Sequence, residues 1–253
     1  MFNWLRKNKA VSYPNPDDWS SGTPDQIERL KRSYSELRKR KVPVYGGPLF
    51  VEDQSEVVGQ SPQDVARRAL ILFAVELQAE GVSRDETHSI LDTLELWEFV
   101  SPKEKEFLFN ENPDPLESQK LVWRLESIWV LMWALGYIEE LGWPSGMCDV
   151  PKLVGLLEPH EKSTEFITKA ALRSISDLLD AQDLTMRIHW AIRDAYLHHQ
   201  GIIPEDLDWS GKSNSVLVTE SAVTGVIEQR HYVLNWLLNF LSPEDWDSVD
   251  TPT

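Results

Sequence analysis

Cysteine is nearly absent from this sequence: Cys148 is the single one among 253 residues, so no disulfide can form within the chain. No other soft metal ligand lies near it in the sequence, and an ordinary, half-buried thiol is expected there. A chain of this length can bury about 70–75% of its unfolded surface. It therefore needs neither disulfides nor a structural metal to fold.

Basic residues are also scarce, since 25 Lys and Arg face 41 Asp and Glu and give a net charge of −16. A nucleic-acid-binding protein would concentrate positive charge where phosphates must be neutralised, so this class of protein is excluded. The acidic residues are spread along the chain rather than gathered in one block. This pattern indicates a solvated, soluble surface.

Long hydrophobic runs are missing as well. The longest apolar stretch is shorter than the roughly 20 residues that a membrane-spanning helix requires. At the start of the chain, residues 1–10 combine three basic side chains with Phe2, Trp4 and Leu5, without the apolar run of a secretory signal. We expect a cytoplasmic protein with no membrane span.

Several catalytic and cofactor motifs are absent: a Gly-x-Ser-x-Gly elbow, His-Glu-x-x-His, a glycine-rich phosphate loop and Cys-x-x-Cys. Glu228 and His231 have the spacing of one half of a helical di-iron site, but no second Glu-x-x-His pair accompanies them. The sequence therefore predicts no metal and no cofactor, and it gives no direct sign of an enzyme.

What the chain does have is tryptophan, eleven in all, and one stretch that reads as a helix apolar on nearly every side, residues 121–141. One stripe of this helix is formed by Leu121, Leu125, Ile128, Met132 and Leu135, and a neighbouring stripe by Trp129, Trp133 and Tyr137. A helix that is apolar all round belongs in the middle of a domain. We therefore expect a buried central helix with other helices packed around it.

The remaining periodic segments predict further helices, most of them begun by a capping Ser, Thr or Asp. Their expected ranges are 24–41, 61–80, 83–97, a shorter one from 101, 149–159, 163–181, 183–199 and 219–241. Residues 42–59 contain a Gly-Gly-Pro turn and are compatible with a short strand at 49–51, whereas 201–215 reads as loop.

The predicted fold is mainly α, a multi-helix globular bundle around a buried central helix, with at most a short strand or hairpin near residues 44–58. Residues 1–59 are expected to form an N-terminal extension with one helix, and residues 60–253 an all-helical main domain.

Charged side chains on apolar faces are the most informative polar residues. Helical wheels place six of them inward or at the edge of a buried stripe: Glu76, Arg124, Glu126, Arg187, Asp194 and Arg230. Because charged groups are almost never fully buried unless paired, they must largely meet one another. They form either an internal ion-pair network or, together with His189 and Arg193, a polar pocket in which arginines receive an anion.

The C-terminal tail has two interpretations. Trp246 and Val249 can anchor it to the core, or the acidic segment of residues 244–247 can serve as a docking peptide for a basic partner.

Several segments between Arg67 and the end of the chain resemble a bacterial family described as a domain of unknown function, number 4272. These are Arg67-Arg68-Ala69-Leu70, Trp123-Arg124-Leu125-Glu126-Ser127, Leu131-Met132-Trp133-Ala134-Leu135-Gly136, His189-Trp190-Ala191-Ile192-Arg193-Asp194-Ala195, Leu234-Asn235-Trp236-Leu237 and Asp250-Thr251-Pro252-Thr253. The family carries an acid directly before the arginine matched by Arg230, whereas this chain has Gln229 there and Glu228 one step earlier. The resemblance implies a mostly helical bacterial domain and implies no activity.

The leading functional hypothesis is an interaction protein, which binds another protein through an acidic, tryptophan-bearing surface and acts as an inhibitor or immunity-type factor. The alternative is a small-molecule-binding protein or a hydrolase-like enzyme with an Arg/Glu/Asp/His pocket between helices. A deep pocket lined by these side chains would favour the second hypothesis. The sequence does not predict the oligomeric state.

Overall fold

The computed structural model describes residues 12–198, 201–211, 215–243 and 245–253. The expectations for residues 1–10, His199 and Glu244 fall outside these ranges. The helices are α1 (Pro24–Lys39), α2 (Pro62–Ala79), α3 (Arg84–Thr93), α4 (Pro102–Phe109), α5 (Pro115–Leu121), α6 (Arg124–Ala134), α7 (Val150–Leu157), α8 (Glu165–Thr168), α9 (Ile175–His198) and α10 (Ala222–Leu237). Short 3-10 turns lie at Pro16–Asp18, Glu158–His160, Val218–Glu220 and Trp246–Ser248. The prediction of a mainly α fold is confirmed.

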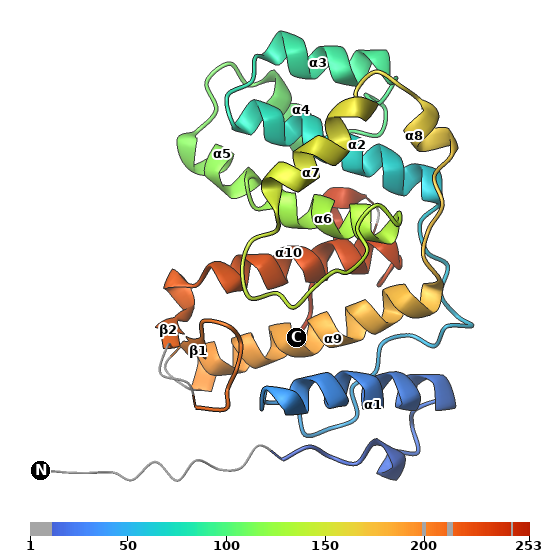
Figure 1. Ribbon diagram of the computed structural model, residues 1–253, viewed down its shortest axis with the longest axis vertical. Coiled ribbons are helices and arrows are strands. Elements are labelled where there is room, and N and C mark those ends of the chain that lie inside the picture. Colours follow the sequence, from blue (N-terminus) through green and yellow to red (C-terminus); the bar gives the residue numbers. More distant parts are fainter. Residues whose placement is uncertain (1–11, 199–200, 212–214, 244) are drawn as a thin grey trace, which may run out of the picture.

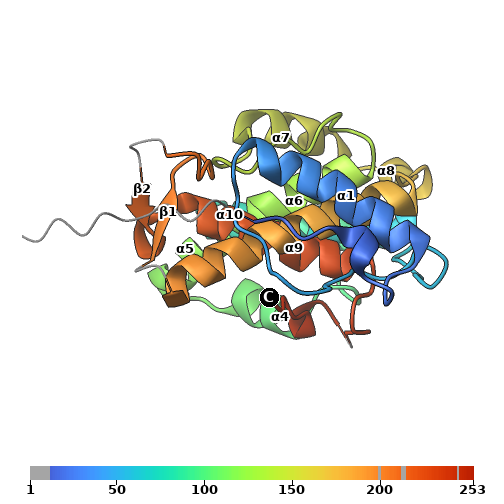
Figure 2. The same cartoon turned by 90° about the horizontal axis from the view of Figure 1, so that it is seen from below.

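The helices are stacked in layers (Figure 1). From one end of the stack to the other, α1 packs on α9, α9 on α10, α10 on α6, and α6 on α2, beyond which lie α3 and α4. Viewed from below, α1 runs alongside α9 (Figure 2). The larger hydrophobic core surrounds α2 and α6, and a smaller one lies between α1, α9 and the start of α10.

The predicted central helix is present as α6, and every residue from Leu125 to Ala134 is buried. It is shorter than the predicted range of 121–141, which was wrong at both ends. Before it, α5 ends at Leu121 and the connecting turn uses i→i+3 hydrogen bonds from Leu125 and Glu126. After it, Gly136 has a φ of +82° and the Tyr137 N–H donates to the Met132 carbonyl at 2.9 Å, which closes the helix end.

Residues 163–199 do not form two long helices as predicted, but the short α8 and one long helix, α9. The predicted break at Gln182 and Asp183 is wrong because both side chains are buried. Asp183 pairs with Arg187 one turn later instead of capping a new helix. The actual start is capped by Ser174, whose hydroxyl oxygen accepts a hydrogen bond from the Asp177 N–H.

The strands also differ from expectation. Residues 49–51 form no strand, because side chains satisfy their carbonyls: Arg187 donates to the Leu49 oxygen at 2.6 Å and Gln26 to the Val51 oxygen at 2.7 Å. Residues predicted as loop instead contain β1 (Ile202–Pro204), which pairs antiparallel with β2 (Ser215–Leu217).

Two helices end earlier than predicted. The ranges that were expected to reach Trp97 and Leu241 end with α3 at Thr93 and α10 at Leu237. Glu95 and Asn239, each with a φ of 54°, adopt the left-handed conformation that cannot continue a helix. The division at residues 59 and 60 remains a prediction.

The C-terminal tail is anchored to the core. Trp246 is buried, and the Tyr232 hydroxyl donates a hydrogen bond to its carbonyl oxygen. The Asp247 carboxylate accepts hydrogen bonds from the Ser101 hydroxyl and the Lys103 N–H, both at 2.9 Å. Val249 packs against the larger core.

None of the helices in the described ranges combines the length and the apolar character that crossing a membrane would require.

Candidate functional site

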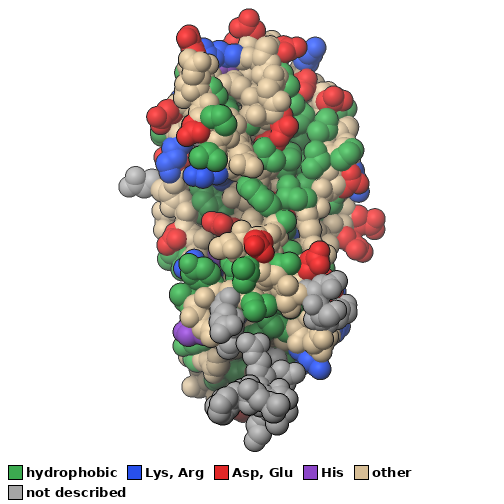
Figure 3. All heavy atoms as spheres, turned by 90° about the vertical axis from the view of Figure 1, so that its left-hand side faces the viewer, with side chains coloured by type: hydrophobic (Ala, Val, Ile, Leu, Met, Phe, Trp, Pro, Cys, Tyr) green, Lys and Arg blue, Asp and Glu red, His purple; other side chains and the backbone are tan. Residues whose placement is uncertain are grey.

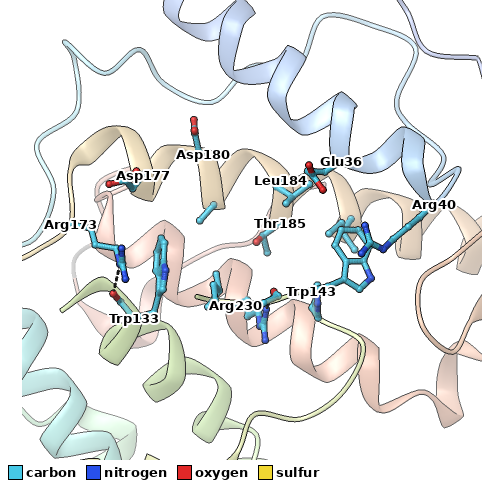
Figure 4. Close-up of a pocket in the computed structure, with 15 residues that line it drawn as sticks. Glu36, Arg40, Trp133, Trp143, Arg173, Asp177, Asp180, Leu184, Thr185 and Arg230 are labelled. Atoms are coloured by element: carbon cyan, nitrogen blue, oxygen red, sulfur yellow. Dashed lines mark hydrogen bonds between the residues drawn. The ribbon is translucent and has the colours of Figure 1, made fainter. Parts of the chain in front are cut away.

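A cleft of about 460 Å³ lies between α1, α9 and the loop that follows α6 (Figure 4). Its floor includes one residue of α10, Arg230. Charged and aromatic groups dominate its walls, with apolar side chains between them. The lining residues are Glu36, Arg40, Trp133, Leu141, Gly142, Trp143, Pro144, Arg173, Asp177, Asp180, Ala181, Leu184, Thr185, Ile188 and Arg230.

The floor is built on a buried ion pair between α10 and α6. Arg230 Nε lies 3.2 Å from Glu126 Oε2, with 5% of the arginine side chain and none of the glutamate side chain exposed. The other Glu126 oxygen accepts a hydrogen bond from the Cys148 N–H. Burial lowers the pKa of Arg230, and the Glu126 charge opposes that effect. The pair fixes the arginine at the junction of the two central helices.

The same environment affects the single cysteine. Burial, followed by the charge of Glu126, raises the pKa of the Cys148 thiol far above its usual value. The thiol is therefore protonated and inert at neutral pH.

Arg230 retains donor capacity that faces the cleft. Its Nη1 donates to the Gly142 carbonyl at 2.9 Å, and Nε is taken by Glu126, but Nη2 has no partner among the described residues. Figure 4 shows Arg230 between Trp133 and Trp143. The Nη2 nitrogen is not among the buried side-chain atoms that lack a partner, so it opens onto the cleft, where it can donate to a ligand. This corner of the cleft is therefore suited to an anion.

A second arginine stands at the end of the cleft nearest α1. The Arg40 guanidinium lies over the Trp143 ring, 4.0 Å from its centroid, and makes no hydrogen bond with a described residue. Trp143 is held in turn by its indole N–H, which donates to the Asp206 carbonyl at 3.0 Å. The stacking orients Arg40 and leaves all its donors available.

Arg173, at the opposite end, is mostly a structural residue. It donates from Nε to the Trp133 carbonyl at 2.7 Å and from Nη2 to the carbonyls of Ile138 and Glu139 at 2.9 and 2.8 Å. These bonds tie Arg173 to the last turn of α6 and to two carbonyls of the segment that follows it. Only Nη1 of Arg173 remains without a hydrogen bond to the described residues.

The acids of the cleft are already engaged. Glu36 pairs with Lys39 at 2.5 Å, and Asp177 accepts a hydrogen bond from Ser174 at 2.7 Å. Asp180 is bound by two arginines of α1, at 3.2 Å by Arg29 and 2.7 Å by Arg32. Among its described residues, the cleft thus offers unused arginine donors, whereas two of its acids are paired with cations and the third, Asp177, accepts a serine hydroxyl.

Of the eight residues proposed from sequence, only Arg230 lines the cleft, and Glu126 lies directly beneath it. Arg187 forms a separate buried pair with Asp183 at 2.8 Å, both side chains 2% exposed. Arg124 packs over the rings of Tyr232 and Trp246 at 4.8 and 5.3 Å. The structure does not bring these groups together into one pocket.

His189 contacts a histidine that was considered for metal binding. Its Nδ1 lies 2.9 Å from Nδ1 of His231, and both rings are buried. Burial, and then the Arg193 charge, lowers the pKa of His189 to about 4; burial, and then His189, lowers that of His231 to about 3. Both rings are therefore neutral, and one donates a hydrogen bond to the other. Glu228, in contrast, is exposed.

The remaining candidates lie apart from the cleft. Arg193 is exposed, and Asp194 contacts His198 at 3.0 Å. Glu76 is 3% exposed, and neither carboxylate oxygen has a hydrogen-bond partner among the described residues. Burial, and then the charge of Glu80, raises the pKa of Glu76 to about 8. It is therefore largely a neutral acid at pH 7. No group of three or more potential metal ligands occurs in the described part of the chain.

Sequence reasoning did not identify Arg40, Arg173 or Trp143 as site residues. Arg40 belongs to a basic cluster that is also expected at the end of a helix, and Arg173 lies in a segment that was predicted to be helical. The sequence feature that could have indicated the site is Trp143, which lies between Gly142 and Pro144. An aromatic residue in a turn is freer to line a site than one in a helix.

The fold and the cleft together define a mainly helical protein with an open site rich in arginine and tryptophan. The chain belongs to the family described as Domain of unknown function (DUF4272), whose model matches residues 29–249. No curated protein and no solved structure matches the chain. The match begins inside α1 and includes every residue that lines the cleft.

Proposed function

We propose that the protein binds a small anionic ligand in the cleft. The observation that carries this proposal is Arg230: its side chain is 95% buried, fixed by Glu126 and Gly142, and still has Nη2 free at the cleft floor. An oriented guanidinium of this kind is the group that proteins use to bind carboxylates and phosphates.

The size and lining of the cleft support a small molecule. Ligand pockets typically measure about 300–1,000 Å³ and combine apolar walls with a few fixed polar groups. Here Leu184, Ile188 and Ala181 of α9 provide apolar wall, and Trp133 and Trp143 provide aromatic edges and faces.

The residues that line the cleft are better suited to binding a ligand than to catalysing a reaction. The described residues that line the cleft include no histidine and no cysteine, and the three acids are held by other partners. Thr185 supplies a hydroxyl without an adjacent general base to activate it. The lining thus resembles a recognition site.

The experiment is isothermal titration of the full chain with a panel of carboxylates and phosphates. We expect saturable binding of at least one anion, weakened at least tenfold by the double variant Glu126→Leu, Arg230→Met, which removes the Arg230 guanidinium without leaving Glu126 unpaired. Arg193→Ala is the matched control, because Arg193 is an exposed arginine outside the cleft. If no anion binds at millimolar concentration, or if both variants weaken binding equally, the proposal is wrong.

Binding of another protein is the second candidate, which we base on an exposed aromatic cluster. Phe109 is 57% exposed and stacks on Trp97 at 5.2 Å, and Leu116 nearby in the chain is 64% exposed. Figure 3 shows apolar side chains over the upper half of one face, with acidic ones around them. The expected partner is basic and presents apolar side chains of its own.

This second function is tested by crosslinking in cells that naturally produce the protein. Phe109→Asp should abolish a specific crosslinked partner, whereas Tyr196→Asp, which alters an aromatic residue 54% exposed at the end of α9, should not. Equal crosslinking by both variants would exclude the aromatic cluster as the docking surface.

A further inference from the structure

We infer that the ligand carries two anionic groups, one held by Arg230 and the other by Arg40, with an apolar or planar body between them against Trp143. This inference rests on the proposed function. It follows from the order of the side chains along the cleft, which Figure 4 shows as Arg173, Trp133, Arg230, Trp143 and Arg40. Arginines and tryptophans alternate, so that a ring separates each cation from the next.

At the Arg230 end of the cleft, only one nitrogen of the guanidinium is available to bind an anion. Nε and Nη1 are already bonded to Glu126 and Gly142, so Nη2 alone is available. Thr185, 6% exposed and also in the lining, makes no hydrogen bond through its hydroxyl to a described residue. Nη2 and this hydroxyl are thus two donors of the lining, and each can donate to an oxygen of a carboxylate or phosphate.

The Arg40 end has the opposite character. This guanidinium is half-buried and makes no hydrogen bond to the part of the chain that the structure describes, so its N–H groups are available for a bidentate contact. Its position over the Trp143 ring reduces the conformational freedom that binding would otherwise remove. The second anion is therefore placed at Arg40, where the whole guanidinium is unused, in preference to Arg173, where Nε and Nη2 are already bonded.

The body of the ligand is defined by what lies between the two arginines. Trp143, Leu141 and Ile188 contribute apolar surface, and the acids of the lining are engaged elsewhere. Two of the three acids in the lining are paired with cations, and an aromatic ring or short hydrocarbon chain would pack on Trp143.

A small dianion is favoured over an acidic macromolecule. The chain carries a net charge of −16, which repels an extended polyanion at long range. A small molecule is affected far less, because it is bound within a cleft where local charges dominate.

The experiment compares matched acids by titration calorimetry: benzoate against terephthalate, and hexanoate, as the aliphatic monoacid, against adipate and suberate. We expect at least one diacid to bind ten times more tightly than the monoacid with the same body. Arg40→Gln should reduce this ratio to about one, and Arg193→Gln should leave it unchanged. Thermal melts of both variants confirm that they fold.

The outcomes separate the two proposals. If no acid binds, the proposed function is wrong. If monoacids and diacids bind equally well to the unaltered protein, the anion site stands and the inference of a second anion is wrong. A diacid advantage that persists in Arg40→Gln would also overturn the inference, because the second anion would then lie elsewhere.

Discussion

Arginine lies over tryptophan at several places in the described part of the chain, and two of these places, at Trp246 and at Trp143, differ in what is left for a ligand. At the tail, Arg68 and Arg124 lie 4.9 and 5.3 Å from the ring of Trp246, which is 2% exposed. At the cleft, Arg40 lies 4.0 Å from the ring of Trp143, which is half-buried.

The bonding of the guanidinium groups explains this difference. Arg68 Nη1 contacts both oxygens of Glu104, at 2.9 and 2.7 Å, and Nη2 donates to the Phe99 carbonyl at 2.7 Å. The Arg40 guanidinium has no such partner among the described residues. The pair of Arg68 and Trp246 is therefore fixed by an acid and a carbonyl and stabilises the chain, whereas the Arg40 guanidinium over Trp143 is left available for recognition.

The largest effect on stability is expected for the ion pair of Arg230 and Glu126, which supports the floor of the cleft. Arg230→Ala should lower the free energy of unfolding by about 3–5 kcal/mol, because it leaves Glu126 buried without its partner. Chemical denaturation measures it. The double variant Glu126→Leu, Arg230→Met should regain most of this loss, since no charge is stranded. A loss below about 0.5 kcal/mol for Arg230→Ala would contradict the burial of the pair.

The next prediction separates the two arginine–tryptophan sites. Trp246→Ala should cost about 3–5 kcal/mol of stability, as expected for a buried tryptophan, and leave anion binding intact. Trp143→Ala should have the opposite effects. It should weaken anion binding and cost less than about 1.5 kcal/mol of stability, because this ring is only half-buried. Denaturation and calorimetry on both variants check the contrast, and equal stability losses would refute it.

Glu76 offers a pH test within the larger core. Its pKa is raised from 4.5 to about 8, so the folded state holds the proton more tightly than the unfolded chain does. The resulting stability is complete below pH 4.5 and is lost as the pH rises through 8. Glu76→Gln should therefore be more stable than the unaltered protein at pH 9, by on the order of 2 kcal/mol.

Denaturation midpoints from pH 5 to pH 9 measure this effect. Glu80→Gln, one turn away, serves as the control and should change the pH dependence much less. Parallel pH curves for Glu76→Gln and the unaltered protein would mean that Glu76 ionises normally.

The smallest expected effect concerns the histidine pair in the α9–α10 interface. The pKa values of His189 and His231 are lowered from 6.5 to about 4 and about 3, so their stabilising contribution is present above pH 6.5 and lost as the pH falls towards 4. His231→Asn should flatten the stability curve over that range by on the order of 1 kcal/mol. His198→Asn, an exposed histidine, is the control. Identical acid sensitivity in both variants would contradict the buried pair.

The spacing of apolar residues predicted the parts of the fold in which a helix buries a continuous apolar face. The apolar stripes around Ile128 and Trp133 identified α6 as the centre, because a helix without a polar side has no stable place on the surface. The interruption at Gly136 was missed, since the apolar pattern continues past it and only the left-handed backbone ends the helix.

The site was much less predictable. Six inward charges indicated that pairs must form, and Arg230 with Glu126 is one such pair, across 104 residues of sequence. Tertiary packing determines which acid pairs with which arginine. Asp183, for example, pairs with Arg187. Arg40, Trp143 and Arg173 come from a helix end and two loops, where side chains have no periodic signal that would predict a shared cleft.

The continuity of α9 has a mechanical consequence. Its 24 residues make a rod about 36 Å long. Near one end it carries Asp177, Asp180 and Thr185 of the cleft, and beyond the other end the chain continues to the β1–β2 hairpin. Because α9 has no break, a tilt of this helix caused by a ligand in the cleft would also displace the far end of the helix.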